Sequence, residues 1–525
     1  MPLRYPPEIV YEKFFQIDYN DKQTLKEFLK ENFYKAYSDV KEYSPKDFKE
    51  NPKFLNKIES LQLKQFAGEV NQIWKTLVKE FDHSFSCEDC FTSIKSKYPF
   101  VVPGGRFQEY YYWDNLWVLH GLIVSEMYQT AYNLVFNILD MIDQIGYMPN
   151  GSRIYYYNRT QPPVITQMVK VLYDAYINDG EDEKAQKLLN YSYTILKSEH
   201  EFFQRHNGIE LEFDGQQKTT MNFYTSNLTS PRPESYRQDY ELHLQNPQRD
   251  EKTLYKNLGA GAESGWDYSS RWFQDGENLG TINLLTIIPV DLNANMLKNE
   301  EILGQFAKNL GKQLDQQYFE SLHQKRYKAI NSLLFNEDKK QWQDYFYESG
   351  QNQQRFYASN YVQLINLKTG ISDGELNPIL TYLQENYVDK YVGGIPASEK
   401  ITGQQWDLPN AWAPSQYYIL EGLWKQPQNL KAQQLAKQIS QNFLKNAFCS
   451  YYNPDLSEKA IYEKYNSEQI GQPGGAGEYT IQVGFGWTNG TILRILQKYP
   501  KIETPQCENN DFDAEILKKI KLFLK

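Results

Sequence analysis

Cysteine is scarce in this chain of 525 residues, with one each at positions 87, 90, 449 and 507. Cys87 and Cys90 have the spacing of two metal ligands, but neither a second such pair nor a spaced histidine pair follows. A zinc site is therefore not expected, and a free thiol pair that is occasionally disulfide-linked is the preferred interpretation. We expect no metal and no organic cofactor.

Positively charged clusters and long apolar runs are also missing. The net charge is −10 and no run of Lys and Arg is interleaved with aromatic residues, which excludes nucleic acid as a partner. The richest apolar segment, residues 282–296, is interrupted by Pro289, Asp291 and two asparagines, so no membrane partner is expected. The first residues lack the apolar core of a signal peptide. This predicts a cytoplasmic protein, or a secreted or lysosomal one if the true N-terminus is missing.

Aromatic residues are abundant instead. They make up 15% of the chain, with 42 Tyr, 28 Phe and 10 Trp. Tyr and Trp combine a flat apolar face with a polar edge, a combination that suits sugar rings. The segment PGGRFQEYYYWD, residues 103–114, places a guanidinium, two carboxylates and several aromatic rings beside a rigid turn. It is typical of a site for a neutral, hydroxyl-covered ligand.

Apolar residues recur with helical periodicity along most of the chain. Residues 119–127 and 134–142 predict a helix pair with a break near Gln129. Further helical stripes cover residues 164–176, 185–203, 302–334, 377–383, 430–443 and 491–499. Strand patterns of comparable length, a fixed-period repeat and a clear linker are absent. The pattern therefore favours a closed all-α array of helices, with functional loops at one end.

Carboxyl groups in aromatic-rich loops are the candidates for chemistry. They are Asp114, Asp267, Asp407, Glu463 and Glu478. Glycoside hydrolysis needs two such groups across the scissile bond. Asp267 lies among aromatic residues in ESGWDYSSRW, where desolvation would keep it protonated as a general acid requires, although an isolated Asp often only caps a helix. The loop around Asp407 favours a cavity wall over catalysis, and the residues alone leave the catalytic pair open.

The loops resemble the signature sequences of one family. The segments PGGRFQEYYYWD, QQWDLPNAWAP and GGAGEY are similar to those of the trehalases, which hydrolyse α,α-trehalose to glucose. The match continues through PNGSR, RTQPP, RPE, ESGWDYSSRW and GFGWTNG in the family's order, from about Pro6 to Tyr499. The resemblance implies an (α/α)6 toroid of paired helices. We expect a single catalytic domain over residues 1–525, with a helical extension, residues 1–97, packed on the barrel, and a monomer.

The resemblance also assigns roles to the carboxyl groups. It implies that Asp267 is the general acid and Glu463 the general base of an inverting mechanism, so that one glucose leaves as the β anomer and the other as the α anomer. Such a mechanism requires roughly 6.5 to 9.5 Å between the two carboxyl groups. The residues that it implies as substrate contacts are Arg106, Trp113, Asp114, Asn150, Arg159, Thr160, Gln161, Arg232, Pro233, Glu234, Gly265 and Glu478.

Two other functions fit parts of the sequence. Another inverting α-glucosidase on the same type of toroid would use the same carboxyl groups with a different leaving sugar. A noncatalytic trehalose sensor would need the arginines but not both carboxyl groups. Because Asp267 and Glu463 are both present, the sensor is disfavoured.

Overall fold

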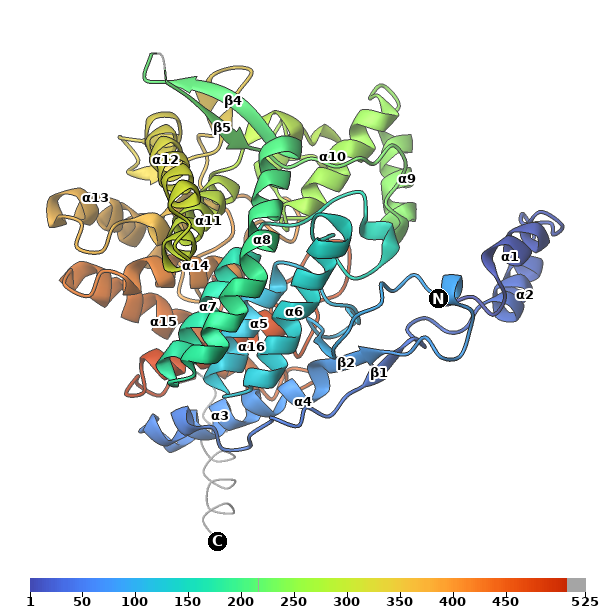
Figure 1. Ribbon diagram of the computed structural model, residues 1–525, viewed down its shortest axis with the longest axis horizontal. Helices are drawn as coiled ribbons and strands as arrows, with labels where there is room; N and C mark the ends of the chain where they lie inside the picture. The colour runs from blue at the N-terminus through green and yellow to red at the C-terminus, as the bar shows by residue number, and fades with distance from the viewer. Residues whose placement is uncertain (216, 508–525) are drawn as a thin grey trace, which may run out of the picture.

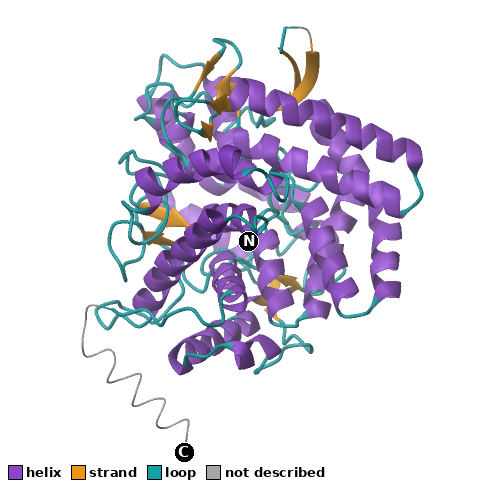
Figure 2. Ribbon diagram, turned by 90° about the vertical axis from the view of Figure 1, so that its left-hand side faces the viewer, coloured by secondary structure: helices purple, strands orange, loops and turns teal. Residues whose placement is uncertain are grey.

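The computed structural model describes residues 1–215 and 217–507, and helices dominate it. The α-helices are α1 (Pro7–Phe14), α2 (Lys22–Asn32), α3 (Leu61–Gln72), α4 (Trp74–Leu77), α5 (Asp114–Val124), α6 (Tyr128–Ile145), α7 (Ile165–Asn178), α8 (Asp182–His206), α9 (Tyr236–Gln245), α10 (Glu251–Glu263), α11 (Val290–Asn309), α12 (Gln313–Ala329), α13 (Asp373–Leu383), α14 (Ala413–Trp424), α15 (Leu430–Tyr451) and α16 (Gly486–Lys498). Figure 2 shows how these helices fill the body of the molecule.

Six inner segments form a closed ring. In order around it they are α5, α7, α11, the 3-10 helix η9 (Ala358–Asn366), α14 and α16, and α16 packs against α5. A second layer surrounds them: α3 packs on α16, α6 on α5 and α7, α8 on α7 and α11, α12 on α11, and α15 on α14 (Figure 1). This arrangement is the predicted (α/α)6 barrel. One inner position is occupied by a 3-10 helix, which the helical periodicity did not indicate.

Burial explains which helices are inner and which are outer. Helix α14, APSQYYILEGLW, is buried along almost its whole length, as expected for an inner helix that is apolar on all sides. The outer helix α15 has an exposed face and begins at an N-cap, where the Asn429 side chain accepts a hydrogen bond from the Ala432 N–H. The ring therefore supplies a rigid, dehydrated scaffold, and the loops at its end carry the variable chemistry.

The structure corrects two expectations about the elements. The stripe at residues 302–334 is not one helix, because the chain turns at Gly311, with φ +69°, between α11 and α12, and it ends in a π-helical turn, Ile330–Leu334. A hairpin of two six-residue strands, β4 (Gly208–Phe213) and β5 (Gln217–Asn222), was missed because its alternation is short and mostly polar. Helices α9, α10 and α14 also lie outside the predicted stripes.

The remaining strands are short and lie around the helical body (Figure 2). They are β1 (Val40–Glu42), β2 (Val78–Phe81), β3 (Phe100–Val101), β6 (Ile287–Ile288), β7 (Phe335–Asn336), β8 (Gln341–Trp342), β9 (Tyr345–Phe346), β10 (Gln351–Asn352), β11 (Asn410–Trp412) and β12 (Lys464–Asn466). The pair β11 and β12 is antiparallel, with Trp412 opposite Lys464. The pair connects the segment QQWDLPNAWAP, which contains β11, to the segment that follows Glu463, which contains β12.

The N-terminal residues do not all lie on the barrel. Helix α3 packs against α16, whereas α1 and α2 lie away from the other helices at the right of Figure 1. Two disulfides are present: Cys87 with Cys90, and Cys449 of α15 with Cys507. Within residues 1–215 and 217–507, none of the helices combines the length and the apolar character that a membrane span requires.

Candidate active site

A cavity of about 280 Å³ collects nearly all of the predicted site residues. Of these, the residues that line it are Arg106, Trp113, Asp114, Asn150, Arg159, Gln161, Arg232, Glu234, Gly265, Asp267, Glu463 and Glu478. They come from loops that are far apart in the sequence. Most of these loops precede or follow a helix of the ring or its outer layer, whereas Arg232 and Glu234 lie in the segment between β5 and α9.

Asp267 lies in the loop after α10, residues 264–272, called here the Asp267 loop. Gly265 has φ +76°, and a Cβ there would lie 2.6 Å from the Trp113 indole, so only glycine fits this position without strain. Burial raises the pKa of Asp267 to about 7, with a smaller contribution in the same direction from the negative charge of Glu478. A substantial fraction of Asp267 is therefore protonated near neutral pH, the state in which a carboxyl group can act as a general acid.

Glu463 lies just before β12 and is 1% exposed. Its backbone N–H donates to the Gln482 carbonyl oxygen at 3.0 Å, and the Tyr479 hydroxyl donates to its Oε1 at 2.7 Å. Oε2 is buried and has no hydrogen-bond partner among the described residues. Burial raises the pKa of Glu463, while Lys464 and Tyr479 oppose that rise. The arrangement leaves one oxygen available to accept a proton from water.

Asp114 is a third carboxyl group in the same cavity. It is the first residue of α5, at the N-terminal end of an inner helix. Burial raises its pKa to about 8, and the charges of Glu463 and Asp267 contribute in the same direction. The three carboxyl groups therefore interact electrostatically, and a protonated Asp114 is able to donate a hydrogen bond to a sugar hydroxyl.

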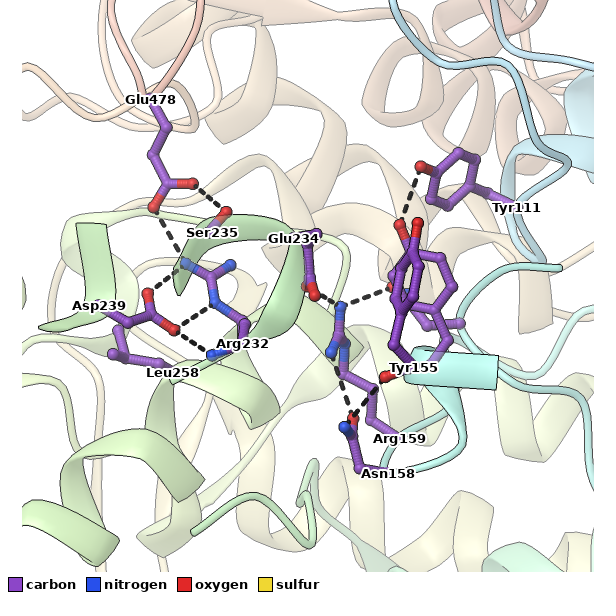
Figure 3. A network of polar contacts seen from close by, with 12 residues as sticks. Tyr111, Tyr155, Asn158, Arg159, Arg232, Glu234, Ser235, Asp239, Leu258 and Glu478 are labelled. Atoms are coloured by element: carbon purple, nitrogen blue, oxygen red, sulfur yellow. Dashed lines mark hydrogen bonds and ion pairs between the residues drawn. The ribbon is translucent and has the colours of Figure 1, made fainter. Parts of the chain in front are cut away.

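Two arginines of the cavity, Arg159 and Arg232, are each held by acidic side chains (Figure 3). Arg232 binds Asp239 through its Nε and Nη2 atoms at 2.9 and 2.7 Å, and its Nη2 also donates to Glu478 at 3.1 Å. Arg159 pairs with Glu234 and donates to the Asn150 amide oxygen at 3.1 Å. Because ion pairs fix these planar groups in advance, little rotamer entropy remains to be lost when a ligand binds.

Arg106 differs from the two buried arginines because it is exposed at the cavity. Its backbone N–H donates to Gln482 Oε1 at 2.7 Å, and its guanidinium lies 5.1 Å from the centre of the Tyr479 ring. Gly105, with φ +57°, permits this turn, because a Cβ would lie 2.3 Å from the Gln482 amide oxygen. The turn thus places one cation over an aromatic wall.

Tryptophans form much of the remaining surface. Trp113, Trp406, Trp412 and Trp487 all line the cavity. Trp406 and Trp412 stack with ring centroids 4.1 Å apart, and Trp487 packs edge-on against Trp412. The sequence segment that contains Trp406 and Trp412 was predicted to be a cavity wall, and the structure places it there.

Three predicted residues lie elsewhere. Thr160 is buried behind the cavity, where its hydroxyl donates to the Met148 carbonyl oxygen and its N–H to Glu263. Pro233 is exposed and begins the 3-10 helix Pro233–Ser235. Asp407 does not line the cavity, because its carboxylate accepts hydrogen bonds from Ser269, Ser270 and Ser398. None of the three is among the residues that line the cavity.

Other residues of the cavity carried no assigned role in the sequence interpretation. They are Tyr37, Tyr155, Tyr156, Gln405, Tyr479, Phe485 and Trp487 among others. Tyr479 and Trp487 lie in the quoted motifs GGAGEY and GFGWTNG, so their motifs could have identified them. Tyr37 lies far from any motif, and only the fold brings it to the cavity.

An (α/α)6 barrel with two buried carboxyl groups in a tryptophan-lined cavity is the architecture of a class of glycoside hydrolases. The Trehalase family model matches residues 10–500. Human trehalase is 39% identical over 510 residues, covering 95% of this chain and 85% of that protein. Trehalase of Dictyostelium discoideum is 38% identical over 519 residues, covering 95% and 86%. The chain belongs to the trehalase family, as its motifs indicated.

Solved structures agree on the fold. Neutral trehalase from Saccharomyces cerevisiae superposes with a TM-score of 0.61 at 21% identity, covering 80% of this chain and 76% of that one. A mannosylglycerate hydrolase from Thermus thermophilus, solved in complex with glucose, gives a TM-score of 0.52 at 15% identity, covering 75% and 95%. At these identities the likeness concerns the barrel and not the substrate.

Proposed function

We propose that this chain hydrolyses α,α-trehalose to two glucose molecules with inversion at the attacked carbon. The observation that carries the proposal is the presence, in one buried cavity, of Asp267 with its pKa raised to about 7 and Glu463 with an unpartnered oxygen. Membership of the trehalase family supports trehalose as the substrate.

The two carboxyl groups divide the chemistry. Asp267 donates its proton to the glycosidic oxygen as the bond from that oxygen to the anomeric carbon breaks. Glu463 accepts a proton from water, and the water oxygen bonds to the same carbon from the opposite face. One β-glucose and one α-glucose leave, and solvent returns the proton from Glu463 to Asp267. The water requires roughly 6.5 to 9.5 Å between the carboxyl groups.

The remaining cavity residues bind and orient the sugar. Arg159 and Arg232 present N–H groups that are already fixed by Glu234 and Asp239, and Arg106 adds a cation at the exposed side. These charged N–H donors can bind the sugar hydroxyls, and such hydrogen bonds are stronger inside a protein cavity than in bulk water. The tryptophans contact the apolar faces of the sugar rings. No step requires a metal or an organic cofactor.

Proton NMR during trehalose hydrolysis tests the proposal. We expect α-glucose and β-glucose in equal amounts at the earliest times, before mutarotation mixes them. The variants Asp267→Asn and Glu463→Gln should each lower kcat by at least about 100-fold, the usual contribution of one positioned acid or base. Exclusive early release of α-glucose would exclude inversion, and turnover near the parental rate by Glu463→Gln would overturn the base assignment.

A panel of other α-glucosides tests the substrate. If maltose or sucrose were cleaved far better than trehalose, the chain would instead be another inverting α-glucosidase on this toroid. If trehalose bound without turnover, a sensor would be the better description.

The compartment and the assembly also belong to the proposal. The two disulfides are typical of proteins from an oxidising compartment, which favours the secreted or lysosomal alternative over the cytoplasmic one. Thiol counting by mass spectrometry on protein from its own cells, with and without reductant, tests this. Four reactive thiols without reductant would restore the cytoplasmic expectation. We propose a monomer, which light scattering measures directly.

A further inference from the structure

Lys464, the first residue of β12, is a buried cation that directly follows Glu463 in the chain. Its side chain is fully covered, with 0% exposure. The ammonium donates to Gln405 Oε1 at 3.2 Å and to the Ala476 carbonyl oxygen at 3.4 Å, and it lies 4.8 Å from the centre of the Trp412 ring. Both of these acceptors are neutral oxygens. A buried ammonium that is held by neutral groups is costly, so a hydrophobic residue would serve packing better.

Gln405 connects Lys464 to the Asp267 loop. While its Oε1 accepts from Lys464, its Nε2 donates to the backbone carbonyl oxygen of Asp267. The next residue, Trp406, donates its N–H to the Tyr268 carbonyl oxygen at 3.0 Å. The amide of Gln405 cannot rotate without losing both contacts. The Gln405 side chain therefore connects the backbone of Asp267 to Lys464 in β12, the strand that follows Glu463.

Lys464 also holds the glycine loop, residues 474–479. Besides the contact of its ammonium with Ala476, its backbone carbonyl oxygen accepts from the Gly474 N–H at 2.9 Å. This loop carries Tyr479, whose hydroxyl donates to Glu463. The glycine loop thus contacts Glu463, and Gln405 contacts the backbone of Asp267. Lys464 contacts both the glycine loop and Gln405.

The charge of Lys464 acts on both carboxyl groups as well. After burial, which raises the pKa of Glu463, the positive charge of Lys464 is the strongest influence in the opposite direction. Lys464 in turn interacts with the charges of Glu463 and Asp267, although burial lowers its own pKa. Tyr479, the Gln482 backbone and Arg106 also favour the ionised form of Glu463, and the buried carboxyl group of Asp114 interacts with it electrostatically. The groups in contact with the Lys464 ammonium are aromatic rings and neutral oxygens. Because these contacts do not neutralise its positive charge, the charge can act on Glu463.

We propose that Lys464 is a positioning residue that keeps Glu463 ionised and, through Gln405, fixes the Asp267 loop relative to the base. The inference rests on the acid and base roles proposed above. It adds that the two carboxyl groups depend on one buried cation. The isosteric loss of that charge should change the pH dependence of the reaction, which a purely structural side chain would not do.

The test is the pH profile of kcat/KM for trehalose in Lys464→Met and Lys464→Arg. In Lys464→Met the missing positive charge raises the pKa of Glu463, so the acid limb should move to higher pH by about one unit. In Lys464→Arg the charge remains, so the acid limb should stay in place while kcat falls because the planar guanidinium does not fit the ammonium's contacts. An unchanged acid limb in Lys464→Met would overturn the proposal.

A matched variant separates the charge from the bridge. Gln405→Leu keeps Lys464 but removes the contact to Asp267, so kcat should fall at least about tenfold with the acid limb unchanged. Its effect should be less than additive with that of Lys464→Arg, since both interrupt the same bridge. Fully additive effects would refute the connection from Lys464 through Gln405 to Asp267. The comparison of Gln405→Leu with Lys464→Arg remains informative if Lys464→Met does not fold.

Glu463→Gln distinguishes failure of this inference from failure of the proposed function. If Glu463→Gln is inactive while the acid limb of Lys464→Met stays in place, the role of Lys464 is wrong and the base assignment stands. If Glu463→Gln is as active as the parent, the base assignment fails and the inference fails with it.

Discussion

The Asp267 loop and the segment around Glu463 place similar carboxyl groups in the same cavity but surround them differently. Asp267 has the negative Glu478 as its strongest charged influence toward protonation, opposed by Arg232. Glu463 has Lys464 and the Tyr479 hydroxyl as its strongest opposing influences, both favouring ionisation. Burial acts on both in the same direction. The difference teaches that neighbouring charges, rather than burial, distinguish the environment of the proposed acid from that of the proposed base.

Removing the cation beside Asp267 should have the largest effect. In Arg232→Met the buried Asp239 loses its two side-chain contacts with the guanidinium, so the free energy of unfolding should fall by about 3 to 5 kcal/mol. Loss of the sugar-binding donor proposed at this position should also lower kcat/KM by at least about 100-fold. Urea unfolding and steady-state kinetics measure both.

The control is Arg237→Met on α9, where the exposed Arg237 forms an ion pair with Glu241. It should change stability by no more than about 0.5 kcal/mol. Equal effects of the two variants would contradict the account of Arg232.

Distorting the backbone of the Asp267 loop should have the next largest effect. Gly265→Ala places a methyl group 2.6 Å from Trp113 at φ +76°, so stability should fall by about 1 to 3 kcal/mol together with activity. Gly475→Ala is the matched control, because nothing lies within 4 Å of the added Cβ. Thermal melting and kcat report both, and a tolerated Gly265→Ala would show that the loop is not held against Trp113.

Removing the negative charge of Glu478, which lies beside Asp267, should shift only the basic limb of the pH profile of kcat/KM. In Glu478→Gln the pKa of Asp267 falls, because Glu478 raises it in the parent. The acid then loses its proton at lower pH, so the basic limb of kcat/KM should move down by about one unit. A basic limb that moves upward or stays in place would show that Glu478 does not tune Asp267.

Removing the hydroxyl group of Tyr479, the residue after Glu478, should shift the acid limb of the pH profile toward higher pH. Tyr479→Phe removes the hydrogen bond to Glu463 Oε1, which raises the pKa of Glu463. The base then ionises at higher pH, so the acid limb should move up by about half a unit. Identical profiles for Glu478→Gln and Tyr479→Phe would remove the contrast between the two carboxyl environments.

Motifs predicted the cavity better than they predicted which residues face it. The sequence segments around Asp114, Asp267, Glu463 and Glu478 do converge, because each lies in a loop at the end of the barrel. A motif does not separate a side chain that faces a ligand from one that supports the backbone. Thr160 was therefore predicted as a substrate contact, although its buried hydroxyl binds a backbone carbonyl oxygen.

The rest depends on contacts between distant segments. Tyr37 and the bridge through Gln405 arise from long-range packing that no local pattern encodes. Helical periodicity indicated four of the six inner segments, α5, α7, α11 and α16, but neither α14 nor Ala358–Asn366, where a 3-10 helix takes an inner position. A 3-10 helix has three residues per turn, so a search for the 3.6-residue period does not find it.

The most direct test of unlike roles for the two carboxyl groups compares trehalose with α-glucosyl fluoride. Fluoride leaves without protonation, whereas a sugar needs a proton from the acid. Asp267→Asn should therefore lose at least about 100-fold in kcat on trehalose but stay within about tenfold of the parent on the fluoride. Glu463→Gln should lose activity on both, because water still needs a base. The reverse pattern, with only Glu463→Gln active on the fluoride, would contradict the assignment.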